Sequence, residues 1–151
     1  MKLTEVTHIA VLVINLCIMA VTFAIFWIQG GKVLKIYPSL DTVDIRFREK
    51  WASGRSNNSF RTRMGGAQNI LDIVVTQDEL WIRTPRLFAG ITKRFKLLKK
   101  SKLTQIQSIQ VNRQTVLVQI NEEFNKTSEV ELKMKNPAVF KNTIEGLLQS
   151  R

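Results

Sequence analysis

Residues 9–28 read IAVLVINLCIMAVTFAIFWI and contain no charged side chain. A helix rises about 1.5 Å per residue, so twenty residues extend about 30 Å, the thickness of the hydrocarbon core of a bilayer. The core helix of a soluble protein does not need to be apolar on every side. The stretch therefore predicts one transmembrane helix over residues 9–29, preceded by a short tail at residues 1–8.

The end of the apolar run favours a retained signal-anchor over a cleaved signal peptide. A signal peptide has an apolar core of about 7–15 residues and small residues at its cleavage site. Here the run is longer and ends in the bulky Phe26, Trp27 and Ile28. Leu16, which precedes Cys17, is also too large for the usual lipoprotein site. Trp27 suits the membrane interface, because an indole can lie among headgroups and donate its N–H.

Basic residues near the span predict its orientation. Lys2 precedes the span, whereas Lys32, Lys35, Arg46, Arg48 and Lys50 follow it. Lys and Arg accumulate on the cytoplasmic side of a membrane helix. We therefore expect the C-terminal domain to be cytoplasmic.

The positive charge of the domain is concentrated in one segment. The chain carries a formal charge of +11, and residues 83–102 contain eight basic side chains and no acidic one: Arg83, Arg86, Lys93, Arg94, Lys96, Lys99, Lys100 and Lys102. A local excess favours a surface that faces an anionic partner. The alternative is a solvated loop that only keeps the protein soluble and oriented.

The scarcity of His and Cys excludes several kinds of site. The only histidine is His8, in the tail, and the only cysteine is Cys17, in the span. An intrachain disulfide, a Cys/His zinc site, and a catalytic triad or dyad that uses His or Cys in the domain are therefore excluded. We expect a non-enzymatic protein with no cofactor and no metal.

After a linker at residues 30–43, the chain alternates between apolar and polar residues as half-buried strands do. We expect a loop at residues 52–59 and a segment at 60–69 in which Gly65 and Gly66 form a turn rather than a phosphate cradle. Residues 70–76 and 80–84 form a hairpin in this interpretation. The strands are predicted at residues 44–51, 70–76, 80–84, 105–111, 115–121 and 128–134.

A C-terminal amphipathic helix is predicted to close the domain. Asn136 is a suitable N-cap, Pro137 suits the first helical position, and Phe140, Ile144 and Leu147 form an apolar stripe. The fold class is therefore α+β: an N-terminal transmembrane helix, then a domain over residues 44–151. Six or seven antiparallel strands followed by one helix is the order of a PH-like β-barrel or sandwich, although periodicity alone also allows another small α+β sheet.

Four segments resemble a group of small bacterial membrane proteins with a PH-like or GRAM-like domain. They are Trp51-Ala-Ser-Gly-Arg-Ser56, Arg63-Met-Gly-Gly-Ala-Gln-Asn69, Val74-Val-Thr-Gln-Asp-Glu-Leu-Trp-Ile82 and Leu103-Thr-Gln-Ile-Gln-Ser-Ile109. The resemblance covers most of residues 44–148 and implies a PH-like fold that recognises lipid or protein. It implies no catalytic residue. Residues 88–102 depart from it, because they are longer and more basic than the proline-containing connector expected there.

Two sets of basic residues are candidates for binding lipid or another anion. The first is Lys93, Arg94, Lys96, Lys99, Lys100 and Lys102, interleaved with Leu87, Phe88, Ile91, Phe95, Leu97 and Leu98. Basic residues attract anionic headgroups, and apolar neighbours can enter the interface, unless they pack in the domain core. The second set is Arg55, Arg61 and Arg63, whose guanidinium groups suit phosphate; a charged loop without a ligand is the alternative.

The sequence thus favours a single-pass membrane protein that presents a basic PH-like domain at the cytoplasmic face for anionic-lipid or protein binding. The alternative is an assembly subunit of a membrane complex, which binds partners through a sheet edge and through Asn15 in the span. Nucleic-acid binding is disfavoured, because a membrane tether accounts for the same charge and no RNA-binding signature is present.

Overall fold

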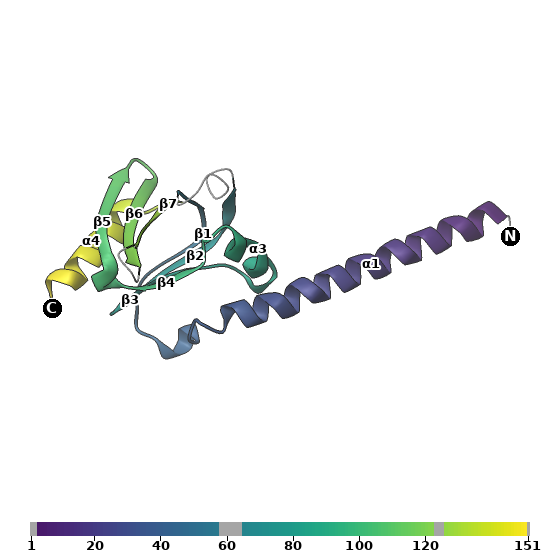
Figure 1. The fold of residues 1–151 in the computed structure, drawn as a ribbon, viewed down its shortest axis with the longest axis horizontal. Helices are drawn as coiled ribbons and strands as arrows, with labels where there is room; N and C mark the ends of the chain where they lie inside the picture. The colour runs from purple at the N-terminus through teal and green to yellow at the C-terminus, as the bar shows by residue number, and fades with distance from the viewer. Residues whose placement is uncertain (1–2, 58–64, 123–125, 151) are drawn as a thin grey trace.

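The computed structural model describes residues 3–57, 65–122 and 126–150, and it contains one long helix that leads into a β-rich domain (Figure 1). Helix α1 (Leu3–Leu34) extends away from the domain as a single rod. Its segment His8–Leu34 is long and apolar enough to cross a membrane, and most of its apolar side chains are exposed. The C-terminus lies at the opposite end of the molecule from the N-terminus.

Helix α1 continues five residues beyond the end that the sequence predicts, into the segment expected to be a linker. The rest of that segment packs on the domain instead of hanging free. The Tyr37 hydroxyl donates to the carbonyl oxygen of Ile82, 2.7 Å away, and lies 3.2 Å from that of Lys99. The Tyr37 ring meets the edge of Trp81 at 6.0 Å between centroids. Helix η1 (Leu40–Thr42) then leads into the first strand.

Seven antiparallel strands form one sheet in the order β4-β3-β2-β1-β7-β6-β5. They are β1 (Ile45–Ser56), β2 (Gly66–Thr76), β3 (Glu79–Arg83), β4 (Lys99–Lys102), β5 (Ile106–Asn112), β6 (Thr115–Glu122) and β7 (Lys126–Lys133). Strands β4 and β5 are its two edges, so the sheet is open rather than closed into a barrel. The predicted hairpin is confirmed as β2 and β3, with Val75 opposite Leu80.

Two parts of the sheet differ from the strands that the sequence predicts. Residues 52–56, expected in a loop, continue β1 beyond an irregularity in its register with β2 between Lys50 and Ala52. Strand β4 consists of Lys-Lys-Ser-Lys, which has no apolar alternation to mark it. It pairs with β3 through backbone hydrogen bonds, and these do not depend on the side chains.

Helix α4 (Pro137–Gln149) covers the core of the sheet, as predicted. Phe140 and Ile144 are fully buried, and the Phe140 ring meets that of Phe47 edge-on at 5.5 Å. Asn136 is the N-cap residue of α4, as predicted, but its side chain makes no capping hydrogen bond. Instead the buried Glu49 carboxylate on β1 accepts backbone N–H bonds from Lys135 and Asn136.

Candidate functional site

Two short helices on the β3–β4 connection pack against the C-terminal end of α1 (Figure 1). They are η2 (Arg86–Phe88) and α3 (Ala89–Arg94). Arg86 Nε donates to the carbonyl oxygen of Trp27 over 2.8 Å, and its guanidinium lies 4.9 Å from the centre of the Trp27 indole. The basic connection is therefore held against the helix rather than free in solvent.

Gly30 and Gly31 make this close approach possible. A Cβ atom on Gly30 would lie 1.7 Å from the backbone oxygen of Arg86, and one on Gly31 would lie 2.4 Å from the Arg86 guanidinium. Any larger residue at position 30 would push η2 away from the helix. The sequence places two glycines in the last turns of α1, but nothing local to them shows that a distant arginine needs the space.

Five side chains of this region form an exposed amphipathic surface, which we call the α3 surface: Phe88, Ile91, Lys93, Arg94 and Lys96. Phe88 is 36% exposed and Ile91 is 42% exposed. Lys93, Arg94 and Lys96 are exposed and form no ion pair with any residue in the described part of the chain. The structure thus exposes two apolar and three cationic side chains within the nine residues from Phe88 to Lys96.

The other apolar residues expected to enter the interface are held more closely to the domain. Leu97 is fully buried in the core, while Leu87 and Leu98 are half-buried. Phe95 packs partly on the core and occupies the space above Gly65, where a Cβ would lie 2.1 Å from its ring. Gly65 and Gly66 have negative φ, and Gly66 begins β2, so Gly65 admits the Phe95 ring and the pair does not form the turn we expected.

The lysines of β4 have environments that differ from those of the α3 surface. The Lys99 side chain is only 9% exposed, and its ammonium donates to Glu122 and to Ser128. Lys100 pairs with Glu79 at 3.3 Å and lies 5.8 Å from the centre of the Trp81 ring. Lys102 is exposed at the far end of β4. The structure brings Lys93, Lys96, Lys99 and Lys100 around one open depression of about 600 Å³.

The ion pair with Lys99 also affects the carboxyl of Glu122. Partial burial alone would raise the pKa of Glu122, because it disfavours the charged form. Hydrogen bonds from Lys99 and Ser128, together with the positive charges of Lys99 and Lys126, outweigh this effect and lower the pKa below its ordinary value. Lys99 therefore stabilises the start of β4 through its contacts with Glu122 and Ser128, and its ammonium is not available to a headgroup.

The second predicted set is only partly described. Arg55 extends over the sheet and forms two hydrogen bonds with the Glu131 carboxylate, at 2.9 and 2.6 Å. Arg61 and Arg63 lie outside the described residues. Within those residues, no group of three or more His, Cys, Asp or Glu side chains is arranged to hold a metal ion.

Comparison with known proteins informs the fold. No protein-family model and no curated protein match the chain in sequence. A chain in the ternary complex of human RhoA, its inhibitor and the DH/PH domain of human ARHGEF11 is similar in structure, with a TM-score of 0.50 and 10% identity over 81% of this chain. This likeness shows the fold alone, and the open sheet with its C-terminal helix is PH-like.

Two further solved structures are less similar. The PH domain from TgAPH has a TM-score of 0.43 and 10% identity, covering 85% of this chain and 95% of that chain. A chain in the complex of the PDZ-RhoGEF DH/PH domains with GTP-γ-S-activated RhoA has a TM-score of 0.48 and 10% identity over 74% of this chain. This protein spans only 31% of the length of the PDZ-RhoGEF complex chain and 36% of the length of the ARHGEF11 complex chain.

Proposed function

We propose that the protein is a non-enzymatic, single-pass membrane protein whose PH-like domain contacts anionic headgroups at the cytoplasmic face through the α3 surface. The observation that carries this proposal is the packing of η2 and α3 on the last turns of α1. The four sequence segments named above further support a place among the bacterial, GRAM-like membrane proteins.

The height of α3 along the helix agrees with this proposal. The apolar run ends at Ile28, and η2 and α3 contact α1 at Trp27, Gln29 and Gly30. These positions lie within about 5 Å of the end of the run along the helix axis. The polar headgroup layer on each side of a bilayer is about 5–8 Å thick. If α1 spans the membrane, the α3 surface lies in that layer.

The composition of the α3 surface suits this position. Phe88 and Ile91 can enter the boundary between headgroups and acyl chains, while Lys93 and Arg94 contact phosphates. Each basic residue near an anionic leaflet contributes about 1 kcal/mol. Since α1 would already hold the domain at the membrane, these weak contacts orient the domain and need not recruit it.

The depth of Ile91 in a bilayer tests the proposal. A spin label on Ile91→Cys, in full-length protein with Cys17→Ala, is placed in nanodiscs of neutral or anionic lipid. We expect the label to be shielded from a water-soluble relaxation agent in anionic discs, and to become exposed at high salt or after charge reversal of Lys93, Arg94 and Lys96. A label on Val111→Cys is the matched control, because Val111 is 37% exposed but lies on edge strand β5.

Equal exposure of the two labels in both lipid compositions would refute headgroup contact by the α3 surface. That result would favour the alternative function, in which the protein is an assembly subunit that binds a partner along the edge of β5. Crosslinking of the full-length chain to co-purified proteins would then identify the surface in use.

A further inference from the structure

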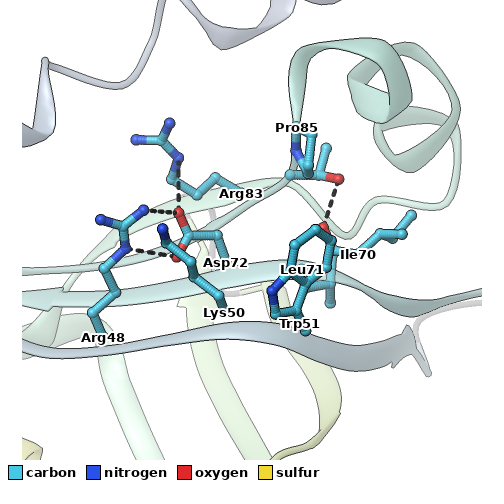
Figure 2. A pocket seen from close by; sticks show the side chains of 9 residues that line it. Arg48, Lys50, Trp51, Ile70, Leu71, Asp72, Arg83 and Pro85 are labelled. Atoms are coloured by element: carbon cyan, nitrogen blue, oxygen red, sulfur yellow. Dashed lines mark hydrogen bonds and ion pairs between the residues drawn. The ribbon is translucent and has the colours of Figure 1, made fainter.

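A second feature lies on the outer face of β1, β2 and β3, beside the start of the β3–β4 connection. A pocket of about 230 Å³ is lined there by Arg48, Lys50, Trp51, Ile70, Leu71, Asp72, Arg83, Thr84 and Pro85 (Figure 2). The charged side chains stand on one side of it, and Trp51 and Pro85 stand on the other. The Thr84 hydroxyl donates to the carbonyl oxygen of Ile70 at 2.8 Å and fixes the wall beside Pro85.

Trp51 has an unusual conformation for so large a residue. Its φ is 66°, and it lies where the register of β1 with β2 shifts between Lys50 and Ala52. A bulky residue in the left-handed region carries strain of the order of 1–3 kcal/mol, and a bulge redirects its side chain. Trp51 is 62% exposed. The strand therefore maintains a costly geometry that turns a large aromatic ring toward solvent at the rim of the pocket.

The charges in the pocket are not balanced. Asp72 accepts two hydrogen bonds from Arg48, at 3.0 and 2.8 Å. These bonds raise the pKa of Arg48 above its ordinary value, and the two charges neutralise each other. Arg83 Nε is 3.8 Å from Asp72, and this buried N–H has no hydrogen-bond acceptor among the described residues. Lys50 is exposed and forms no ion pair with a described residue.

We propose that this pocket, the Trp51 pocket, binds a phosphate monoester, with Lys50 and Arg83 contacting the phosphate and Trp51 covering the group esterified to it. Three cations, Arg48, Lys50 and Arg83, line the pocket against the single carboxylate of Asp72. The resulting excess of two positive charges matches a phosphate monoester, which carries about −1.5 to −2 at neutral pH. Arginine suits phosphate because its planar guanidinium donates two parallel hydrogen bonds. The ester can belong to a membrane lipid or to a soluble molecule.

This inference is independent of the proposed function, because neutral discs provide no anionic headgroups for the α3 surface. Full-length protein labelled with 5-fluorotryptophan is placed in phosphatidylcholine nanodiscs, and phenyl phosphate is added. The chain has three tryptophans, so ¹⁹F spectra show three resonances, and Trp51→Phe assigns one of them. We expect the Trp51 resonance to shift to saturation. Inorganic phosphate and phenol each reproduce one part of phenyl phosphate, so either one alone should bind more weakly than phenyl phosphate does.

Variants test the two cations. Lys50→Gln should weaken phenyl phosphate binding about fivefold, and Arg83→Gln should weaken it about tenfold or more. Lys126→Gln is the matched control, because Lys126 is also an exposed strand lysine but does not line this pocket. An unmoved Trp51 resonance, or an equal shift in the Lys50→Gln and wild-type proteins, would overturn the proposal.

Discs that contain phosphatidic acid distinguish the two sources of the ester. If the ligand is a lipid, the Trp51 resonance will already be shifted in these discs and phenyl phosphate will move it little further. If the ligand is soluble, the Trp51 resonance will match that in phosphatidylcholine discs until phenyl phosphate is added. Either pattern supports the Trp51 pocket and assigns its ligand.

Discussion

Replacing Gly30 with alanine tests whether the domain is packed on α1. The added Cβ would lie 1.7 Å from the Arg86 carbonyl oxygen and 2.7 Å from its carbonyl carbon. Heavy atoms in contact are separated by about 3.5 Å, so η2 would have to move by roughly 1.5 Å or more. The obstacle is backbone, which cannot turn aside as the end of a flexible side chain can.

The cost of this movement follows from the contacts that it breaks. Overpacking a well-fitted site costs about 1–3 kcal/mol. The movement would also lengthen the 2.8 Å bond from Arg86 to the Trp27 carbonyl and lift the guanidinium from the indole. We expect Gly30→Ala to weaken the docking of η2 and α3 by about 2 kcal/mol, which is about a 30-fold change in the docking equilibrium.

Gly146 provides a matched control in the same residue type and the same secondary structure. It lies in α4, and a Cβ there would meet no atom within 4 Å. Helix propensity alone predicts that Gly→Ala stabilises a helix by about 1 kcal/mol. Helix propensity alone would make Gly→Ala stabilising at both positions. The clash with Arg86 makes the substitution destabilising at position 30.

Hydrogen exchange of the α3 amides in nanodiscs measures the docking directly. A helix of six residues is unstable alone, so protection of its amides depends on packing. We expect these amides to exchange about 30-fold faster in Gly30→Ala and at the wild-type rate in Gly146→Ala. Wild-type protection of α3 in Gly30→Ala would refute the docking, and with it the argument that places the α3 surface at the headgroup layer.

Three further predictions concern groups inside the domain. Burial raises the pKa of the Tyr37 hydroxyl above its ordinary value of 10.0, so the contribution of Tyr37 to stability is complete below pH 10 and is lost as the pH rises through the folded pKa. Tyr37 is the only tyrosine in the sequence, so phenolate absorbance reports on it alone. Phenolate absorbance that appears near pH 10 in the folded protein would contradict this prediction. The lowered pKa of Glu122 stabilises the fold above the ordinary value of 4.5, and this contribution is lost as the pH falls through the folded value; urea unfolding of Glu122→Gln should therefore show a weaker acid dependence than the wild type. Glu49→Ala should lower the free energy of unfolding by about 2 kcal/mol, because the backbone N–H groups of Lys135 and Asn136 before α4 lose their acceptor. A loss below about 0.5 kcal/mol in urea would contradict that role.

Much of the fold could be predicted because it depends on periodic burial. Strands β6 and β7 alternate as their burial requires, and the Phe140–Ile144 stripe of α4 has helical spacing. The β2–β3 hairpin is recognisable from its β-branched and aromatic residues, because its adjoining ends are buried on both faces. Strand β4 could not be found in this way. None of its side chains joins the apolar core, and Lys99 is buried against Glu122 and Ser128 instead. The backbone pairing of β4 with β3 leaves no signal in residue type.

The candidate sites were harder to predict because they depend on contacts between distant residues. A run of basic residues indicates positive charge but does not show which ammonium has a partner; Lys99 meets Glu122 only when β4 and β6 end near each other. Trp51 reads as the last residue of a strand, and its left-handed φ results from a register shift with β2. The approach of Arg86 to Gly30 joins residues 56 positions apart, which no local pattern records.

The distribution of paired and unpaired cations links these contacts to the proposed function. Arg83, Lys99 and Lys100 lie on the sheet and face carboxylates, whereas the three cations of the α3 surface form no ion pair with a described residue. Three unpaired cations at about 1 kcal/mol each would favour the headgroup-facing orientation by roughly a hundredfold. Such a preference is small for a freely diffusing domain. It is sufficient if α1 spans the membrane, because the helix then holds the domain at the surface and the contacts need only orient it.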